Sequence, residues 1–392
     1  MSDPNINEDF LKYIDGELAR LWRLGMNAII GWSSLRDGIA VLSVPQFLLP
    51  SILPNYENIL VGSRKMSKSK LQAVSNICEI EPYTIKFPAF PRPKKTPWKA
   101  LDGLIQRYSI IKTNDRAVIL FDIVDFSRYT ALEQVTALNN LSYSINIAQS
   151  RAKENGLDIV VSLSTTGDGF YIWNENKNLQ PNLDLYCLMM LVLAGNALNA
   201  QKSSKTIVPD LRTCFHVGSC YEYYQVTGES LSANHFIVGD VTIDLARMID
   251  RALPGQILIG NFHNFMENET QPLNTVQFMD RARKHFALFE NITLSREKIS
   301  TIKCYLTGEK TEDGEFNISR YVIRDKHEYQ HVVFNAKVNI YRQRGIPVYL
   351  GRQSCDLENF KTINRAPLDQ TPDKTGVIDF PLKRRSRNPL ER

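Results

Sequence analysis

Two acidic residues of this chain, Asp122 and Asp168, each lie beside short apolar runs, and they are 46 positions apart. Asp122 follows the run at residues 118–121, and Asp168 lies in a Gly-Asp-Gly turn between runs at residues 159–163 and 170–173. Short apolar runs bounded by turn residues are typical of buried strands. The sequence therefore places two carboxylates at strand ends, where neighbouring strands would bring them together.

Two carboxylates in this arrangement are suited to divalent cations. A pair of metal ions about 3.5–4 Å apart serves in-line displacement at phosphorus. The residues after Asp122 predict an anion site, because Phe126 and Ser127 lead into an amphipathic helical pattern at residues 128–153. The free N–H groups and positive dipole end at the start of a helix bind anions. We therefore expect adjacent metal and anion sites.

The order of the predicted elements indicates a fold class. After the first strand, helix and hairpin, the apolar patterns predict a helix at 183–200, a strand at 211–225, a helix at 241–251 and a strand at 257–259. This order predicts an α+β sandwich with a largely antiparallel sheet.

A third motif completes the pattern. Phe-Ile-Val-Gly-Asp at residues 236–240 leads into the third predicted helix and then into Pro-Gly-Gln-Ile-Leu-Ile at residues 254–259. The three motifs, in this order and spacing, resemble those of the class III nucleotide cyclases over residues 115–260. The resemblance implies the palm-like α+β sandwich of that family.

The resemblance also implies a metal-dependent reaction. Asp122, Asp168 and the backbone carbonyl of Ile123 would bind two Mn²⁺ or Mg²⁺ ions, while Phe126 and Ser127 would contact the triphosphate. The ribose 3′-oxygen would attack the α-phosphorus, and pyrophosphate would leave. Because no protein nucleophile is needed, catalysis would consist of positioning and charge stabilisation.

In this family an Asn and an Arg on one helix contact the ribose and the transition-state phosphate. Asp244 lies nearest the Asn position and Arg247 nearest the Arg position, but they are three residues apart where the family has four. Arg251 is the alternative for the phosphate contact. The family's site is shared between two chains, so one motif set implies a homodimer with shared active sites, the metal aspartates coming from one subunit and Arg247 from the other.

The positions that recognise the base differ from those of purine cyclases. Adenylate cyclases of this class use a Lys and an Asp where this chain has Ser164 and Phe236, and guanylate cyclases use a Glu and a Cys. A site that hydrogen-bonds one base rejects a base lacking those groups by roughly 10⁴–10⁵. A bulky Phe236 would also narrow the pocket. The chain therefore resembles the pyrimidine cyclases of the Pycsar antiphage systems, which make cyclic UMP or cyclic CMP.

The residues leave UTP and CTP both open as the substrate. The hydroxyls of Ser164, Thr165 and Thr166 can rotate to donate or accept hydrogen bonds, so they suit either pyrimidine. Cyclic UMP is expected only because uridylate enzymes are the commoner members of the group, and a separate cyclic-nucleotide effector would read the product. An adenylate cyclase with an atypical base pocket and a non-catalytic nucleotide-binding module are the remaining alternatives.

Composition adds expectations about partners and location. The net charge is +5, but the basic residues cluster at 383–387 and 64–70 as solvated segments, so no nucleic-acid partner is expected. The apolar stretch at residues 39–54 is interrupted by two prolines and is too short to span a membrane. The six cysteines form no CxxC pair, which favours a reducing, cytoplasmic location.

Four regions are expected along the chain. Residues 1–109 would form a helical region with a Pro-rich linker, residues 110–265 the cyclase domain, residues 270–365 a sensor-like domain and residues 366–392 a basic tail. The third region is β-rich and resembles the adenylyl/guanylyl cyclase and SMODS C-terminal sensor domain. That resemblance rests on these residues: Asp325, Lys326, His327, Asn335, Lys337, Asn339 and Gly351.

Overall fold

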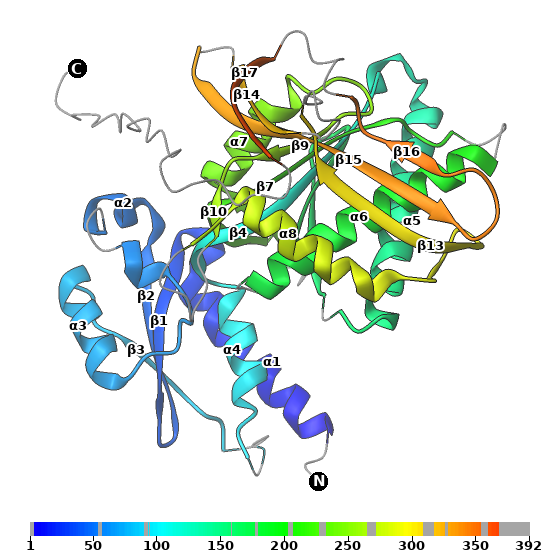
Figure 1. Ribbon diagram of the computed structural model, residues 1–392. Helices are drawn as coiled ribbons and strands as arrows, with labels where there is room; N and C mark the ends of the chain where they lie inside the picture. The colour runs from blue at the N-terminus through cyan, green and yellow to red at the C-terminus, as the bar shows by residue number, and fades with distance from the viewer. Residues whose placement is uncertain are drawn as a thin grey trace.

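The computed structural model contains a small N-terminal unit and a large sheet with helices on both faces (Figure 1). It describes residues 4–53, 57–89, 93, 95–157, 159–176, 179–202, 207–226, 233–264, 272–308, 317–325, 328–353 and 360–367. Lys326, His327 and the predicted basic tail beyond residue 367 lie outside the described residues.

The N-terminal unit is α+β: in addition to helices it contains a sheet that the expected helical region did not include. A three-stranded antiparallel sheet lies between helices. Its strands are β1 (Asn27–Leu35), β2 (Gly38–Pro45) and β3 (Tyr83–Lys86), and its helices are α1 (Pro4–Trp22), α3 (Lys68–Cys78) and α4 (Trp98–Gln106).

The second strand shows why this sheet was missed. Ile39 and Val41 of β2 pack with apolar residues of α1 and α4, whereas Leu42 and Val44 pack with those of α3. Both faces of the strand are therefore buried. A strand buried on both faces has a continuous apolar run in place of the alternation that identifies a half-exposed strand.

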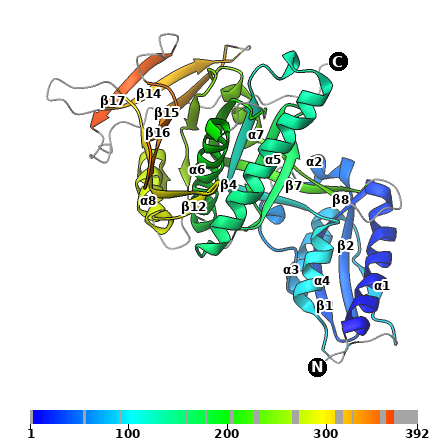
Figure 2. The same cartoon turned by 90° about the vertical axis from the view of Figure 1, so that its right-hand side faces the viewer.

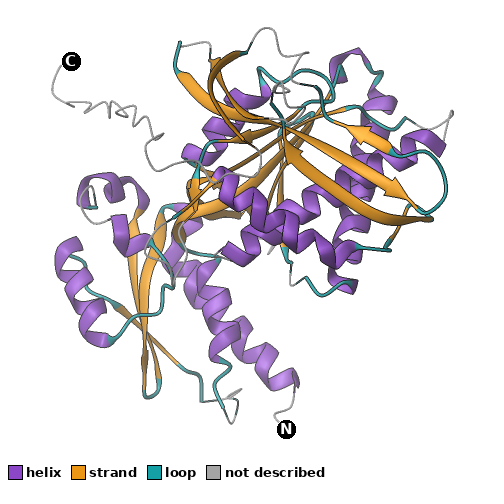
Figure 3. Ribbon diagram, viewed as in Figure 1, coloured by secondary structure: helices purple, strands orange, loops and turns teal. Residues whose placement is uncertain are grey.

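The large sheet confirms the predicted fold class. Its strands run in the order β12-β13-β15-β9-β7-β4-β6-β5, where β12 is Thr293–Leu294, and every neighbouring pair is antiparallel except β7 with β9. Figure 3 shows the strands of the sheet in orange among the purple helices. The strands of the predicted cyclase region are β4 (Ile110–Ile123), β5 (Val161–Thr165), β6 (Gly169–Asn174), β7 (Leu211–Val226), β8 (Ala233–Val238) and β9 (Ile257–Gly260).

Helices cover both faces of this sheet. Helices α5 (Ala131–Glu154) and α6 (Leu179–Lys202) lie side by side on one face with α8 (Thr275–His285), and α7 (Asp240–Ile249) packs on the other (Figure 2). Within the part of the chain that the structure describes, α6 alone is long and apolar enough to cross a membrane, and 83% of its most apolar window is buried in the protein. This helix therefore fits the core of the fold.

The C-terminal strands extend the same sheet. The β-rich character expected of the sensor-like region is present in β14 (Asn317–Arg324) and β15 (Gln330–Arg342), and a further strand, β13 (Glu297–Leu306), precedes them. However, β15 pairs with β9, and Phe334 shares a core with Phe215 of β7. Residues after 270 therefore do not form a core of their own, contrary to the expected separate domain. A sensory role for them stays a prediction.

Candidate active site

The structure brings Asp122 and Asp168 together at the ends of two paired strands. Asp122 near the end of β4 lies opposite Gly169, the first residue of β6. A Cβ atom on Gly169 would lie 1.9 Å from the carbonyl oxygen of Phe121, so only glycine permits this approach. The hairpin is then fastened to β4 by the Ile123 N–H, which donates to the Asp168 carbonyl at 2.9 Å.

The two carboxylates influence each other. Asp122 is only 6% exposed, and its burial raises the pKa of its carboxyl above the ordinary value. The nearby carboxylate of Asp168 raises that pKa further, whereas Arg212 opposes the rise. The protein therefore keeps two acids close together at an energetic cost, which is characteristic of a functional site.

Arg212 is the functional candidate that sequence reasoning missed. It lies opposite Asp122 in the β4–β7 ladder, with Nε 2.7 Å and Nη2 2.5 Å from Oδ2 of the aspartate. The sequence placed Arg212 at the start of a strand but did not show which strand lies beside it. Only the pairing of β7 with β4 brings the guanidinium to the acidic pair.

The oxygen donors at these strand ends fit a divalent cation that binds together with an anionic ligand. No group of three or more His, Cys, Asp or Glu side chains that could hold a metal occurs among the described residues. Asp122, Asp168 and the Ile123 carbonyl are hard oxygen donors of the kind that Mg²⁺ and Mn²⁺ prefer. Because Arg212 offsets one carboxylate charge, phosphate and water oxygens would have to complete the coordination.

The predicted anion site is a short turn before α5 and not the start of that helix. The helix begins at Ala131, where Thr130 and Glu133 form a capping box, so its first turn is already capped. A 3₁₀ turn, Phe126–Arg128, precedes it and follows the left-handed Asp125, with φ 55°. Its first backbone hydrogen bond is donated by Arg128 to Asp125.

The N–H groups of Phe126 and Ser127 therefore lie at the open end of the turn. Left-handed and right-handed residues in succession form a concave nest of N–H groups that binds anions. Ser127 is exposed, whereas the ring of Phe126 packs against the core beside α5. The turn thus offers backbone amides close to the carboxylates of the preceding strand.

The predicted catalytic residues of α7 are held by groups of their own chain. Asp244 lies between His216, whose Nε2 is 3.5 Å from Oδ2, and His331, whose Nδ1 is 3.4 Å from Oδ1. Burial acts to raise the pKa of the Asp244 carboxyl, but hydrogen bonds from the two histidines and their charges lower it well below the ordinary range. A ribose contact by Asp244 therefore stays a prediction without support from this geometry.

Arg247 is paired as well, and the neighbouring positions are exposed. Its Nε lies 3.0 Å from Oδ2 of Asp325, which follows β14. Ile243, four residues before Arg247, is an apolar side chain that is 47% exposed, and Arg251 is also exposed. On α7, Arg247 is therefore the cationic side chain that lies near Asp244, and an ion pair holds it there.

The two expected base-recognising residues are not joined in one pocket within the chain. Ser164 lies on β5 two residues after Ser162, whose Oγ is 2.9 Å from Nδ1 of His235. Phe236 follows His235 and stacks on Tyr223, with ring centroids 5.7 Å apart. Because successive strand residues point to opposite faces, Phe236 faces away from the side of β8 that meets β5.

Thr165 lies at the hairpin itself. Its hydroxyl accepts a hydrogen bond from the Gly167 N–H at 3.0 Å, and its side chain is exposed. It therefore shapes the turn that carries Asp168, and a contact with a base stays a prediction.

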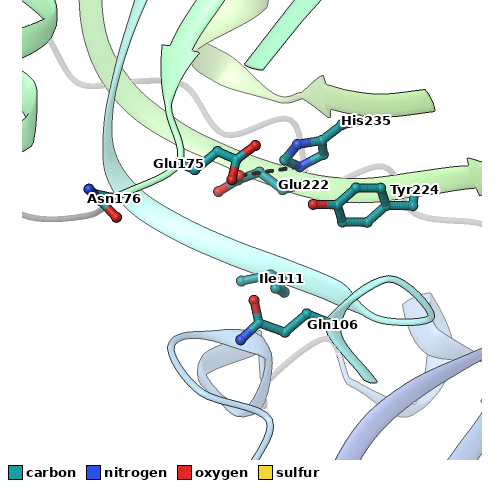
Figure 4. Close-up of a pocket in the computed structure, with 7 residues that line it drawn as sticks. All are labelled: Gln106, Ile111, Glu175, Asn176, Glu222, Tyr224 and His235. Atoms are coloured by element: carbon teal, nitrogen blue, oxygen red, sulfur yellow. Dashed lines mark ion pairs between the residues drawn. The ribbon is translucent and has the colours of Figure 1, made fainter. Parts of the chain in front are cut away.

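A separate polar pocket of about 230 Å³ lies at the other end of β4, between the N-terminal unit and the sheet. Figure 4 shows Glu175, Glu222 and His235 on one side of it and Gln106 and Ile111 on the other. The floor is a buried network, since Glu222 pairs with Arg116, and Nε2 of His235 lies 3.5 Å from Glu222 Oε2. This pocket is distinct from the Asp122 site.

Comparisons with protein-family models and with curated proteins give no match. The similar solved structures are guanylyl and adenylyl cyclase domains. The guanylyl cyclase Cya2 is 12% identical, with coverage of 57% of this chain and 92% of that chain and a TM-score of 0.35. The adenylyl cyclase CyaB from P. aeruginosa is 12% identical, with coverage of 59% and 97% and a TM-score of 0.34. The guanylate cyclase domain of RhGC from Catenaria anguillulae, in complex with GTP, is 15% identical, with coverage of 59% and 99% and a TM-score of 0.32. TM-scores this low carry no argument about family or function.

Proposed function

We propose that this protein is a metal-dependent nucleotide cyclase that converts a nucleoside triphosphate to a 3′,5′-cyclic nucleotide and pyrophosphate. The observation that carries the proposal is the placement of Asp122 opposite Gly169, so that Asp168 lies near enough to raise its pKa, next to the open amide turn at Phe126 and Ser127. Phosphoryl transfer without a protein nucleophile needs carboxylates that bind the metal ions and amides that bind the phosphates.

Each group of the site has a defined part in this proposal. Asp122, Asp168 and the Ile123 carbonyl would hold Mn²⁺ or Mg²⁺, two ions per site, and these ions would act as Lewis acids toward the ribose 3′-oxygen and the phosphates. The turn amides of Phe126 and Ser127 would orient the triphosphate, and Arg212 would attract the same anion. Arg247 would neutralise charge at the α-phosphate from the second subunit of a homodimer.

A homodimer is supported by apolar side chains near α7. Val238, at the end of β8, and Ile243, on α7, are both about half exposed. Covering them would place α7 of one subunit against its partner, as a shared active site requires.

For the substrate we propose a pyrimidine nucleotide, UTP first and CTP as the alternative. The support is that Ser164 carries neither of the charged side chains that the purine enzymes of this class use at this position. A cytoplasmic location, a role in antiphage defence and a separate effector for the product belong to the same proposal. The five cysteines that the structure describes are buried, and no disulfide joins any two of these five, which suits a reducing compartment.

A non-catalytic nucleotide-binding module is the second candidate, and the ion pair of Arg212 with Asp122 favours it. A guanidinium on a metal ligand competes with the metal. In such a module the nucleotide would bind through the turn amides and Arg212 without turnover.

Purified full-length protein incubated with Mn²⁺ and each of the four ribonucleoside triphosphates tests these alternatives, with products identified by mass spectrometry. Cyclic UMP or cyclic CMP is the expected product. Cyclic AMP as the main product would contradict the pyrimidine assignment and indicate an adenylate cyclase with an atypical pocket. Nucleotide binding without any product would favour the binding module.

A further inference from the structure

The C-terminal strands contribute a buried acid to the helix that carries Arg247. Asp325 directly follows β14, and its side chain is only 3% exposed. Two hydrogen bonds join Asp325 to Tyr329: the Tyr329 N–H donates to Asp325 Oδ1 at 2.9 Å, and the Asp325 N–H donates to the Tyr329 carbonyl at 3.0 Å. These bonds restrict the carboxylate where it meets α7.

Arg247 is held by two contacts from Asp325 and Tyr329. Asp325 Oδ2 lies 3.0 Å from its Nε, and the guanidinium carbon lies 5.8 Å from the ring centroid of Tyr329. An ion pair and a cation–π contact on one side chain together restrict its rotamer. A long, flexible arginine is thereby fixed in one orientation.

The contacts leave part of the guanidinium open. The contact with the carboxylate is at Nε, and within the described residues neither Nη1 nor Nη2 of Arg247 donates a hydrogen bond to another side chain or to the backbone. The side chain is still 31% exposed. The Nη edge of an arginine matches two phosphate oxygens, so an arginine anchored at Nε can still bind a phosphate.

Two histidines connect this pair to the rest of the helix. His331 of β15 has Nε2 3.4 Å from Asp325 and Nδ1 3.4 Å from Asp244, and His216 of β7 lies on the other side of Asp244. The cluster therefore ties α7 to β7, β15 and Asp325 after β14. Asp244 and Asp325 are each held by a cationic or hydrogen-bonding partner, so the arrangement is electrostatically satisfied.

We propose that Asp325, supported by Tyr329, is a positioning residue that turns the Nη edge of Arg247 toward the phosphate of the nucleotide. The C-terminal strands, which lie beyond the motifs at residues 115–260, would thus complete the active site. This inference rests on the proposed cyclase function. An inhibitory contact would instead engage the Nη edge and block it.

The first test compares Asp325→Asn with Asp184→Asn in the full-length protein. Asp184 is a matched control, because it is also a buried acid, paired with His285 between α6 and α8, and lies on the other face of the sheet. We expect Asp325→Asn to lower kcat by about tenfold or more while KM changes by less than about threefold. Asp184→Asn should leave both constants within about twofold.

An unchanged or raised kcat in folded Asp325→Asn protein would overturn the inference, and a raised kcat would indicate an inhibitory latch. If Asp325→Asn fails to fold, Tyr329→Leu replaces it, because this change removes the ring face and keeps the carboxylate. The same fall in kcat, of smaller size, is expected for Tyr329→Leu, and an unchanged kcat would again contradict the proposal.

Subunit mixing separates a positioning defect from a general structural one. In a homodimer with shared sites, Asp325→Asn chains mixed with Asp122→Ala chains should regain up to one working site per mixed dimer. Asp325→Asn chains mixed with Arg247→Ala chains should regain none, because both changes damage the same half of the site. Recovered activity in the second mixture would overturn the proposal that Asp325 acts through Arg247 of its own subunit.

The controls distinguish failure of this inference from failure of the proposed function. If Asp122→Ala and Arg247→Ala are inactive while Asp325→Asn is fully active, only the inference fails. If the wild-type protein forms no cyclic nucleotide, or Asp122→Ala keeps its activity, the proposed function itself fails.

Discussion

Arg212 and Asp122 form an ion pair across the β4–β7 ladder, with Nη2 of the arginine 2.5 Å from Oδ2 of the aspartate. This ion pair offsets the negative charge of the buried Asp122 carboxylate. Burial and the charge of Asp168 nevertheless raise the pKa of Asp122. The folded protein therefore maintains a carboxylate that would be easier to ionise in the unfolded chain. Such a group weakens the fold at neutral pH and is explained by a functional need.

We expect Asp122→Asn to stabilise the protein at neutral pH by roughly 1–3 °C in Tm, because an amide has no ionisation cost. A carboxyl whose folded pKa is raised costs stability above that pKa and costs none below its unfolded value of about 3.9. The difference from wild type should therefore shrink as the pH falls toward 4. Thermal melts in EDTA from pH 8 to pH 4 measure it, and a clearly lower Tm at pH 8 would show that loss of the Arg212 pair dominates.

Mn²⁺ should raise the Tm of the wild-type protein when a non-cyclisable triphosphate is present, because a ligand that binds only the folded state stabilises it. Asp122→Asn and Asp168→Asn should lose most of this shift, and Asp122→Ala or Asp168→Ala should abolish turnover. Thermal melts with Mn²⁺ and with EDTA, together with product assays, provide the measurements. Activity within about tenfold of wild type in either alanine variant would refute the metal assignment.

Phe236→Ala should lower stability by about 0.5–1.5 kcal/mol beyond the lost apolar burial, because Phe236 stacks on Tyr223. Since the ring faces away from the side of β8 that meets β5, the ratio of UTP to ATP turnover should change little. Urea unfolding and assays with both nucleotides test the two parts. A ratio that falls sharply would instead place Phe236 in a pocket completed by the second subunit.

Arg116→Met should destabilise the protein by about 3–5 kcal/mol, because it leaves the carboxylate of Glu222 buried without its cation. Arg116 and Glu222 are 1% and 7% exposed, respectively. The double variant Arg116→Met/Glu222→Met should recover much of that loss, since paired apolar replacements avoid the desolvation cost. Denaturant unfolding of the three variants measures the coupling, and equal losses in the single and double variants would contradict it.

Local patterns in the sequence were sufficient to predict the order of the helices and strands around Asp122 and Asp168. Alternation, apolar runs and turn residues depend on neighbours along the chain, so helices α5, α6 and α7 and the hairpin of β5 and β6 were predicted close to their observed bounds. The first half of β4 was missed, because its polar residues around Arg116 and a bulge interrupt the pattern.

The sequence by itself determined that Asp122 and Asp168 each lie where an apolar run meets a turn, because apolar runs and the Gly-Asp-Gly turn are local features. Only the tertiary structure decided which distant side chains contact the residues of the candidate site. Arg212 reaches Asp122 through the pairing of β7 with β4, and Asp325 reaches Arg247 through the packing of the C-terminal strands on α7. Strand pairing and helix packing join residues about 80–90 positions apart, and no short pattern along the chain encodes such contacts.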